Sequence, residues 1–400
     1  MTHNEPPKWH FLALFFGLMY VICHVSTAQA SPYRPTNPDQ VLEKLPRDFP
    51  QLTLDPRTVA QTPSDVDAKL SQIQKLLEYA YLQGDPRALG QATALLQRHP
   101  MSSNNVPLLM LRAQAAQANH QFAEATKFLK QVTQQQPNHS EAYLQLASIE
   151  LVSGHFNTAR QSCELVRGLD ALVLRLVCLA QVDAMTGKLA DTAAKLQKIS
   201  QLLDTLNASQ QLWVQLIQAD IALRLNDKIL MAKILKQLPT NNVPALTARA
   251  DWLMAQGQWQ KVYDLLKNHT EHEGLLIRWL TSKHRLKHAD AIEHQKLLTE
   301  KIAQWRRRND QAHYREQASY ALLAESAKQS LNLARENWKT QRETADMVIY
   351  ATAALRSKSQ VDIQALLDWA DSTRFEYPIV LQRLIAAQNT IKPHTQDRVK

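Results

Sequence analysis

The stretch GHFNTARQSCELV, from Gly154 to Val166, closely repeats the earlier stretch HQFAEATKFLKQV, from His120 to Val132. The two segments begin 34 residues apart and share Phe, Ala and Val at the same offsets. They differ mostly where a helix would face water. A chain that repeats itself at this interval predicts an architecture of similar units stacked one on the next.

Small residues recur at the same interval along much of the chain. In the frame of the opening pair, the eighth place of most units is alanine: Ala113, Ala147, Ala180, Ala219, Ala250, Ala318 and Ala351. Glycine recurs at a different phase: Gly84, Gly154, Gly187 and Gly257. A unit of two helices and a tight turn explains both patterns. Alanine permits a close approach of the helices, and glycine tolerates the positive φ of the turn.

This pattern resembles the tetratricopeptide-repeat (TPR) superfamily, most clearly in SEAYLQLASIELVSGHFNTARQSC (140–163). GDPRALGQA (84–92) and LARENWKTQRETAD (333–346) resemble exported bacterial TPR proteins. The resemblance implies an all-α, right-handed α-solenoid of about nine helical hairpins over 64–376, a capping helix over 377–391 and a tail over 392–400. The units are expected to begin near 70, 106, 140, 173, 212, 243, 277, 311 and 344, and the unit at 277 places His284 where alanine is usual.

The first thirty residues have the pattern of a signal peptide. Lys8 and His10 precede an apolar run from Phe11 to Val25, and Ala28 and Ala30 supply the small residues of a cleavage site. The run is shorter than the roughly 20 residues that span a bilayer. We therefore expect cleavage near Ala30 and export to the periplasm. The alternative is an inner-membrane anchor formed by residues 11–25. Residues 31–63 hold seven of the 17 prolines and are expected to form an extended linker.

In TPR proteins, the second, fifth, ninth, twelfth and thirteenth places of each first helix line a concave groove. The corresponding candidate binding residues are Met110, Gln114, Gln117, Leu144, Ser148, Leu151, Val177, Gln181 and Met185. Aliphatic, methionine and glutamine side chains suit an extended peptide or an amphipathic helix. The other interpretation is that such residues form core between stacked hairpins.

These features predict an exported protein–protein interaction scaffold whose partner is a protein or peptide. An inner-membrane protein is one candidate partner. The alternative is a membrane-tethered assembly or accessory factor for an envelope or metal-transport membrane complex. Basic and acidic residues are interspersed although the net charge is +9, so no nucleic-acid partner is expected. The sequence lacks a glycine-rich phosphate loop, a nucleophile elbow and a recognisable carboxylate pair. We therefore expect no enzyme activity, no cofactor and no small-molecule substrate.

Two clusters offer other chemistry. His284 and His288 are four residues apart and would share one face of a helix, as a metal site requires. The neighbouring Lys283, Arg285 and Lys287 would repel a cation, so a solvated basic helix is expected and no metal site. The run 305–308, Trp-Arg-Arg-Arg, could bind an anionic head group, but a basic helix end that complements the helix dipole is the simpler interpretation.

Cys163 and Cys178 are expected to lie level with one another on antiparallel helices. Each is about seven residues from the turn between the second helix of one unit and the first helix of the next. An oxidising compartment would join such a pair if the Cα atoms lie within about 7 Å. The alternative is that both thiols are free and fill core.

Overall fold

The computed structural model describes residues 37, 47–50, 63–98, 105–168, 171–307, 313–324 and 326–391. The chain divides into two units, Met1–Phe49 and Pro50–Lys400, and the folded helices belong to the second. The predicted signal peptide (1–30), nearly all of the predicted linker and the predicted tail (392–400) lie outside the described residues. No helix in the described ranges has the length and apolar character needed to cross a membrane.

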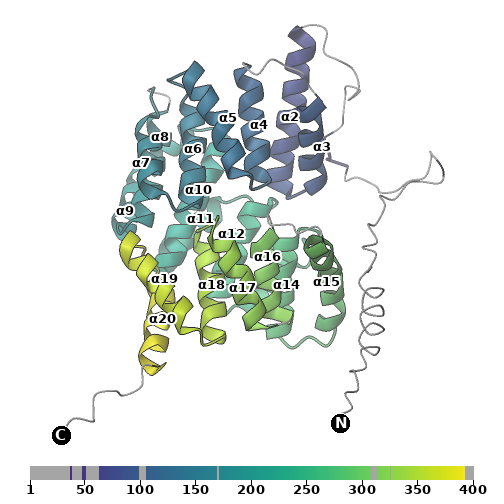
Figure 1. The fold of residues 1–400 in the computed structure, drawn as a ribbon, viewed down its shortest axis with the longest axis vertical. Coiled ribbons are helices and arrows are strands. Elements are labelled where there is room, and N and C mark those ends of the chain that lie inside the picture. Colours follow the sequence, from purple (N-terminus) through teal and green to yellow (C-terminus); the bar gives the residue numbers. More distant parts are fainter. Residues whose placement is uncertain are drawn as a thin grey trace, which may run out of the picture. The chain divides into compact units, whose positions relative to one another are not determined.

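The described part of the second unit forms an all-α solenoid of nine helical hairpins and a last helix, α20 (Pro378–Ile391), which confirms the predicted fold class (Figure 1). The first five hairpins are α2 (Pro63–Gln83) with α3 (Pro86–Arg98), α4 (Val106–Ala118) with α5 (Phe122–Gln135), α6 (Ser140–Val152) with α7 (Phe156–Glu164), α8 (Leu172–Met185) with α9 (Leu189–Lys198), and α10 (Ala208–Leu225) with α11 (Lys228–Gln237). A 3₁₀ helix, η1 (Ile199–Thr205), follows α9. The last four hairpins are α12 (Val243–Ala255) with α13 (Trp259–Leu266), α14 (Glu273–Arg285) with α15 (Ala291–Arg307), α16 (Tyr314–Ala324) with α17 (Ala327–Trp338), and α18 (Thr344–Arg356) with α19 (Gln360–Thr373).

Eight of these hairpins turn through a residue with positive φ at one repeat position, the fifteenth. Glycine occupies it at Gly84, Gly154, Gly187 and Gly257. Other residues adopt the same backbone in the remaining four, namely His120, Asn226, Lys287 and Lys358. The left-handed backbone reverses the chain, so the second helix begins within one or two residues in most units.

The turn at Lys287 corrects the predicted start of the seventh unit. Counting back to the first place gives residue 273, where α14 begins, and not 277. The eighth place is therefore Leu280, which is fully buried, and not His284. The unit departed from the alanine pattern only because its predicted start was four residues too late.

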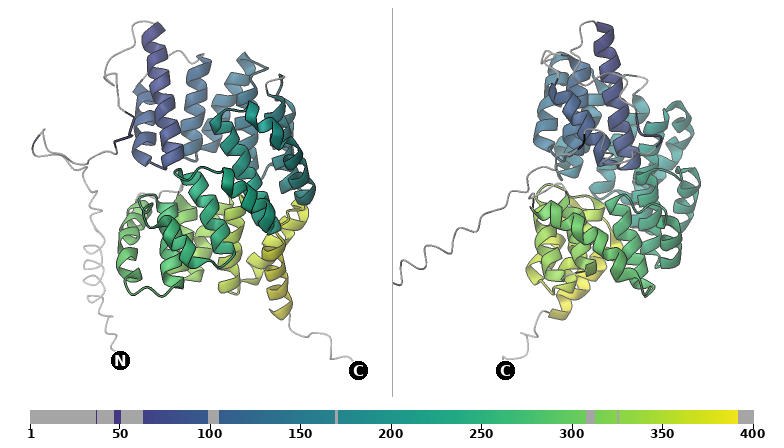
Figure 2. Two further views of the ribbon diagram at one scale, coloured as in Figure 1. Left: turned by 180° about the vertical axis from the view of Figure 1, so that it is seen from behind. Right: turned by 90° about the vertical axis from the view of Figure 1, so that its right-hand side faces the viewer.

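The solenoid returns on itself, so that the turns of its first four hairpins contact residues near the ends of later helices (Figures 1 and 2). We call this line of contacts the seam. Its hydrogen bonds include Arg342 N–H to the Val152 carbonyl at 2.7 Å, Leu189 N–H to Glu376 Oε2 at 2.7 Å, and a 2.8 Å bond between Gln341 Nε2 and His120 Nδ1. The chain therefore closes on itself and does not form an open superhelix.

Glycine at the turns lets the seam close. A β-carbon on Gly154 would lie 2.8 Å from Cδ of Arg342, and one on Gly187 would lie 2.8 Å from Cβ of Arg374. Real β-carbons essentially never approach other atoms so closely. These glycines therefore serve both the left-handed turn and the approach of a distant segment.

One apolar cluster extends across the seam. It joins Ala147 and Phe156 of the third hairpin with Ala351 of α18 and Tyr377 and Leu384 near the end of the chain. All five residues are buried. Burial of apolar surface from both halves holds the closed form together.

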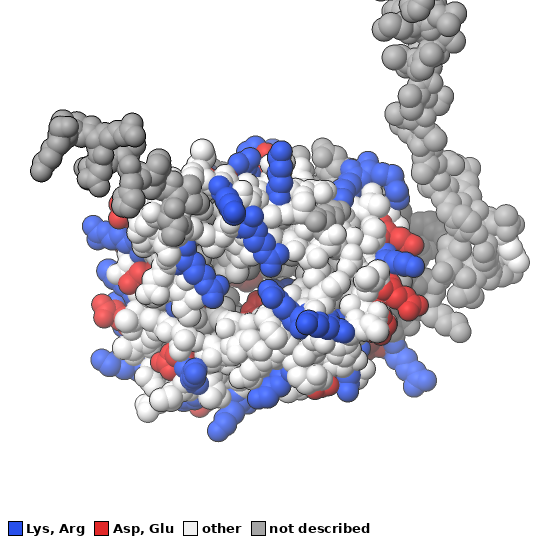
Figure 3. All heavy atoms as spheres, turned by 90° about the horizontal axis from the view of Figure 1, so that it is seen from below, with Lys and Arg blue, Asp and Glu red and all other residues white. Residues whose placement is uncertain are grey.

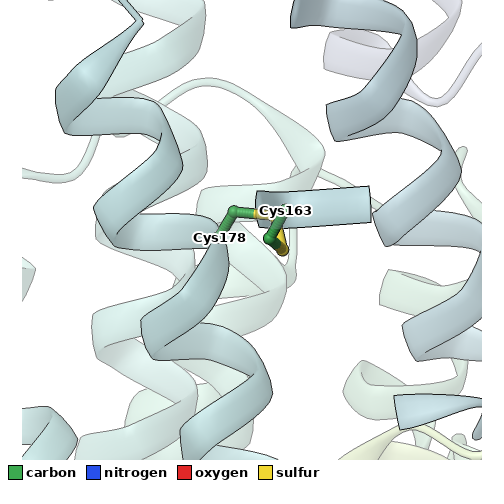
Figure 4. The surroundings of a disulfide bond; sticks show 2 residues. All are labelled: Cys163 and Cys178. Atoms are coloured by element: carbon green, nitrogen blue, oxygen red, sulfur yellow. A yellow bond between two sulfur atoms is a disulfide. The ribbon is translucent and has the colours of Figure 1, made fainter. Parts of the chain in front are cut away.

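A disulfide joins Cys163 of α7 to Cys178 of α8 within this cluster (Figure 4). The Cα atoms are 5.6 Å apart, and the residues are 0% and 2% exposed. The pair thus bridges two successive hairpins at the positions that the sequence frame predicts.

Candidate functional site

The predicted groove residues divide into two groups. Four are buried in apolar clusters, so they contribute to packing in this structure: Met110, Leu151, Val177 and Met185. Their burial does not follow from the repeat position alone, because Leu144 at the fifth place and Gln117 at the twelfth are only partly buried. In addition, Leu151 and Met185 share the cluster that crosses the seam.

The other five are partly exposed: Gln114, Gln117, Leu144, Ser148 and Gln181. Gln114 Nε2 lies 3.4 Å from Glu141 Oε1 of the next unit. Leu144 packs against two apolar clusters. That these residues bind a partner remains a prediction. Three of them, Gln114, Ser148 and Gln181, are polar residues at the ninth place of successive first helices.

A second group of side chains surrounds a hollow beside the seam. Tyr81 is 57% exposed, yet its pKa is raised, first by burial and then by the charge of Glu343. His120 is also exposed, and burial lowers its pKa. A side chain that water can reach, although protein surrounds it on most sides, lies in a recess and not on an outer surface. Seen from below, the molecule is hollowed in its middle, with acidic atoms inside and Lys and Arg side chains around the opening (Figure 3).

Ion pairs between adjacent first helices form part of this recess. Arg278 of α14 binds Asp251 of α12 through two hydrogen bonds of 2.7 and 3.0 Å, and donates a third to the Gly274 carbonyl at 2.9 Å. Burial acts to lower the pKa of Arg278. The charge and hydrogen bonds of Asp251, together with the charge of Glu316, outweigh burial, so the pKa is raised above its ordinary value. The guanidinium therefore remains charged and fixed in orientation.

The next ion pair, between α16 and α18, is more extensive. Arg315 donates to both carboxylate oxygens of Asp346, at 2.6 and 2.8 Å, and also bonds Glu343 and the amide oxygen of Gln341. The opposing effect of burial is overcome by Asp346 and Glu343, so the pKa of Arg315 is raised well above its ordinary value. Because Gln341 also bonds His120, this network joins the inner wall to the seam.

Residues at the start of α14 complete the lining of the recess. Lys301 Nζ lies 2.8 Å from Glu273 Oε1, and this bond holds the pKa of Glu273 below its ordinary value although burial acts to raise it. Burial lowers the pKa of the adjacent His272. A β-carbon on Gly84 would clash with the His272 ring at 2.1 Å, so the first hairpin closes directly over this histidine.

Glu316 differs from the other charged groups of the recess. It is half-buried, and it makes no hydrogen bond or ion pair within the described residues. Its charge acts on His120, His272, Arg278 and Arg315, so it lies among all four.

We define the inner hollow by Tyr81, His120, Asp251, His272, Glu273, Arg278, Lys301, Arg315, Glu316, Glu343 and Asp346. Its five carboxylates exceed its three Lys and Arg side chains by two. With neutral histidines, the inner hollow therefore carries a net charge of −2 within a chain of net charge +9. Such a recess attracts a cationic group.

The histidine cluster is not arranged as a metal site. Helix α14 ends at Arg285, so His284 and His288 do not share a helix face. His284 Nε2 lies 2.9 Å from Gln295 Oε1, and His288 packs on Tyr263. No group of three potential metal ligands occurs in the described ranges.

The basic run at the end of α15 is anchored by its tryptophan. Trp305 is 6% exposed and stacks on His313, with 4.2 Å between ring centroids. Arg307 is exposed, and Arg308 lies outside the described residues. The binding of an anionic group by this run remains untested.

Comparison with known proteins agrees with the repeat geometry. A family model described as a tetratricopeptide repeat matches residues 116–171. The chain therefore contains a tetratricopeptide repeat. The match contains α5 and α7, which are the helices of the opening sequence repeat, and α6 between them. This TPR protein therefore has the architecture of a protein–protein interaction scaffold, which is typical of non-catalytic proteins.

A crystal structure of a Rap protein complexed with competence and sporulation factor is similar to this TPR protein at 10% sequence identity, with a TM-score of 0.43. The alignment covers 82% of this chain and 98% of that chain. No conclusion about function follows from a similarity at this level. No curated protein sequence matches the chain.

The sequence frame did not identify the inner hollow. One signal was present: Asp251 with Arg278, and Arg315 with Asp346, are opposite charges separated by nearly one repeat, 27 and 31 residues. At that spacing, first helices of adjacent hairpins bring such residues together. Glu316 gave no signal, because its surroundings depend on the closure of the chain.

Proposed function

We propose that this TPR protein is an exported scaffold that binds a positively charged peptide segment of a partner in the inner hollow. The observation that carries the proposal is the unpaired carboxylate of Glu316 in a recess whose other charges are arranged and paired. A lysine or arginine side chain, or a peptide amino terminus, would satisfy it.

Side chains that line the inner hollow would also orient the bound peptide segment. Arg278 and Arg315 are held by two-point bonds to carboxylates, so they present fixed donors at little further cost in side-chain entropy. The partly exposed Gln114, Ser148 and Gln181 continue a polar ninth-place row along the first helices. Amide and hydroxyl groups of this kind suit the backbone of an extended peptide.

Export is part of the proposal. It is supported by the apolar run from Phe11 to Val25, by the small residues at Ala28 and Ala30, and by the disulfide between Cys163 and Cys178. An inner-membrane protein with a basic segment facing the periplasm would be a suitable partner. Amino-terminal sequencing of the purified protein tests the export step, because a chain beginning at Ser31 is expected and an intact Met1 would contradict it.

A photo-crosslinking residue placed in the hollow tests the binding step. We expect the substitution at Tyr81 to capture a partner peptide containing lysine or arginine, identified by mass spectrometry. The same residue at Lys130, which is exposed on α5, serves as the matched control. Glu316→Gln should weaken capture at Tyr81 without changing the melting temperature. Equal capture at both positions, or capture unaffected by Glu316→Gln, would contradict the proposal.

A further inference from the structure

The last three complete hairpins present a distinctive edge at the ends of α14, α16 and α18. These first helices are neighbours in the stack, and they begin beside the seam and run away from it (Figure 1). Their turns therefore lie together at the end remote from the seam. We call the turn residues Arg285, Lys287, Ile292, Lys328, Arg356, Lys358 and Val361 the basic edge.

Two aliphatic side chains on this edge are largely in water. Val361 is 78% exposed in the first turn of α19, and Ile292 is 69% exposed in the first turn of α15. A single exposed aliphatic residue is ordinary on a protein surface. Here two of them lie at equivalent ends of nearby hairpins, among basic residues.

The basic residues of this edge keep their charge unpaired, although Arg356 donates a 2.8 Å hydrogen bond to the Leu322 carbonyl and Arg285 lies over the Trp259 ring. Nearby acidic residues are neutralised. Asp290 accepts an ion pair from the buried Lys283 at 2.8 Å. Asp362 is bound by Arg335 at 2.6 and 2.7 Å and by the Tyr350 hydroxyl at 2.7 Å.

By contrast, the five basic side chains of the edge are exposed, and none forms an ion pair with a carboxylate in the described ranges. Glu293 is the remaining exposed acidic residue among the described parts of these turns. The unpaired charge of the edge is therefore more positive than a count of its basic and acidic residues indicates. Lys and Arg side chains are numerous on the side of the molecule seen from below (Figure 3).

The helix dipole does not account for this arrangement. Arg285 and Arg356 lie in the last turns of α14 and α18, where a positive charge is favourable. Lys328, however, lies in the first turn of α17, where a positive charge is unfavourable. Lys287 and Lys358 also adopt a positive φ that glycine would adopt without strain. A binding role explains lysine at these positions better than folding does.

We propose that the basic edge docks on the surface of an anionic phospholipid bilayer. Lysine and arginine would lie near the head-group phosphates, and Ile292 and Val361 would enter the interfacial region between head groups and acyl chains. Docking through this edge holds the protein peripherally at a membrane and does not require a spanning helix. It would leave the seam, at the other end of α14, α16 and α18, facing away from the lipid.

Co-sedimentation of the purified full chain with vesicles tests this proposal. Vesicles of phosphatidylcholine alone are compared with vesicles in which phosphatidylglycerol replaces part of it. Any retained apolar run at the amino terminus would bind both kinds alike, so the difference between them isolates the electrostatic contribution. We expect binding to anionic vesicles only, lost at about 0.5 M salt because the charges are then screened.

Substitutions in the basic edge test whether this surface is the one that binds the vesicles. Lys287→Glu with Lys358→Glu should reduce the partition onto anionic vesicles at least about 25-fold, at about fivefold per lost lysine. Ile292→Ser with Val361→Ser should reduce it about tenfold or more. The matched controls are Lys127→Glu with Lys130→Glu on α5 and Ile229→Ser on α11, whose side chain is 86% exposed.

Unchanged helicity and melting temperature show that each variant is folded. Equal binding of the wild type to both kinds of vesicle would overturn the proposal. A loss as large in the α5 control would also overturn it, since the effect would then depend on net charge alone. An acidic protein partner would be indicated if the lysine variant lost a cellular partner while the wild type ignored anionic vesicles.

Discussion

The backbone N–H of Arg342 donates a 2.7 Å hydrogen bond to the carbonyl oxygen of Val152, the last residue of α6. The side chain of the same arginine covers Gly154, two residues further along that turn. This relationship between Arg342 and Val152 joins a turn of the third hairpin to the segment before α18. It encloses the inner hollow that we propose as the binding site.

Three glycine substitutions separate the requirements of the seam from those of the turn. Gly154→Ala introduces both an unfavourable φ of +79° and a clash with Arg342, so we expect a loss of about 2 kcal/mol in unfolding free energy. Gly257→Ala has an unfavourable φ of +67° but open space, and should cost about 1 kcal/mol. Gly90→Ala lies within α3 with nothing nearby and should stabilise by about 0.5–1 kcal/mol. Urea denaturation measures all three, and equal losses at Gly154 and Gly257 would show that Arg342 does not cover the turn.

Ala147, at the eighth place of the third hairpin, is fully buried in the cluster that crosses the seam. Ala147→Leu should cost roughly 1–3 kcal/mol because the cluster has no room for the added atoms. Ala147→Gly should cost about 1 kcal/mol through helix propensity. A melting curve of Ala147→Leu that matches the wild type would contradict the alanine frame.

The bond between Cys163 and Cys178 predicts a simple chemical result. Protein denatured without reductant should show no reactive thiol from this pair, and reduction should release two. The chain-entropy model assigns about 3 kcal/mol of stability to a loop of this size, so reduction should lower the melting temperature. Two thiols reactive before reduction would show that the pair is open.

Stability should fall at acidic pH partly through Asp362. Burial acts to raise its pKa, but Arg335, Ser359 and Tyr350 together lower it from 3.8 to about 2. Because the folded-state pKa is depressed, the contribution is fully present above about pH 4 and is lost as the pH falls towards 2. It amounts to about 2 kcal/mol. Asp362→Asn should therefore be less stable than the wild type at pH 7, with a smaller difference near pH 2. A difference independent of pH would contradict this assignment.

The sequence predicted the hairpin solenoid because helix pairing is local and its alanine and glycine places recur. It did not predict the turns at His120, Asn226 and Lys287, where residues other than glycine adopt positive φ. Nor could it predict the burial of Leu151 and Met185, because later helices join the cluster that covers them. The surroundings of Glu316 likewise depend on contacts between units far apart in the chain.

Hydrogen exchange at the amide of Arg342 tests the closure of the solenoid most directly. The residue precedes α18 and has no helical partner for this N–H, so only the bond to Val152 protects it. We predict protection comparable to that of helical amides, reduced strongly in Gly154→Ala and little in Gly257→Ala. Exchange of the Arg342 amide at the rate of an unstructured loop in the wild-type protein would show that the seam is open and would contradict the enclosed site.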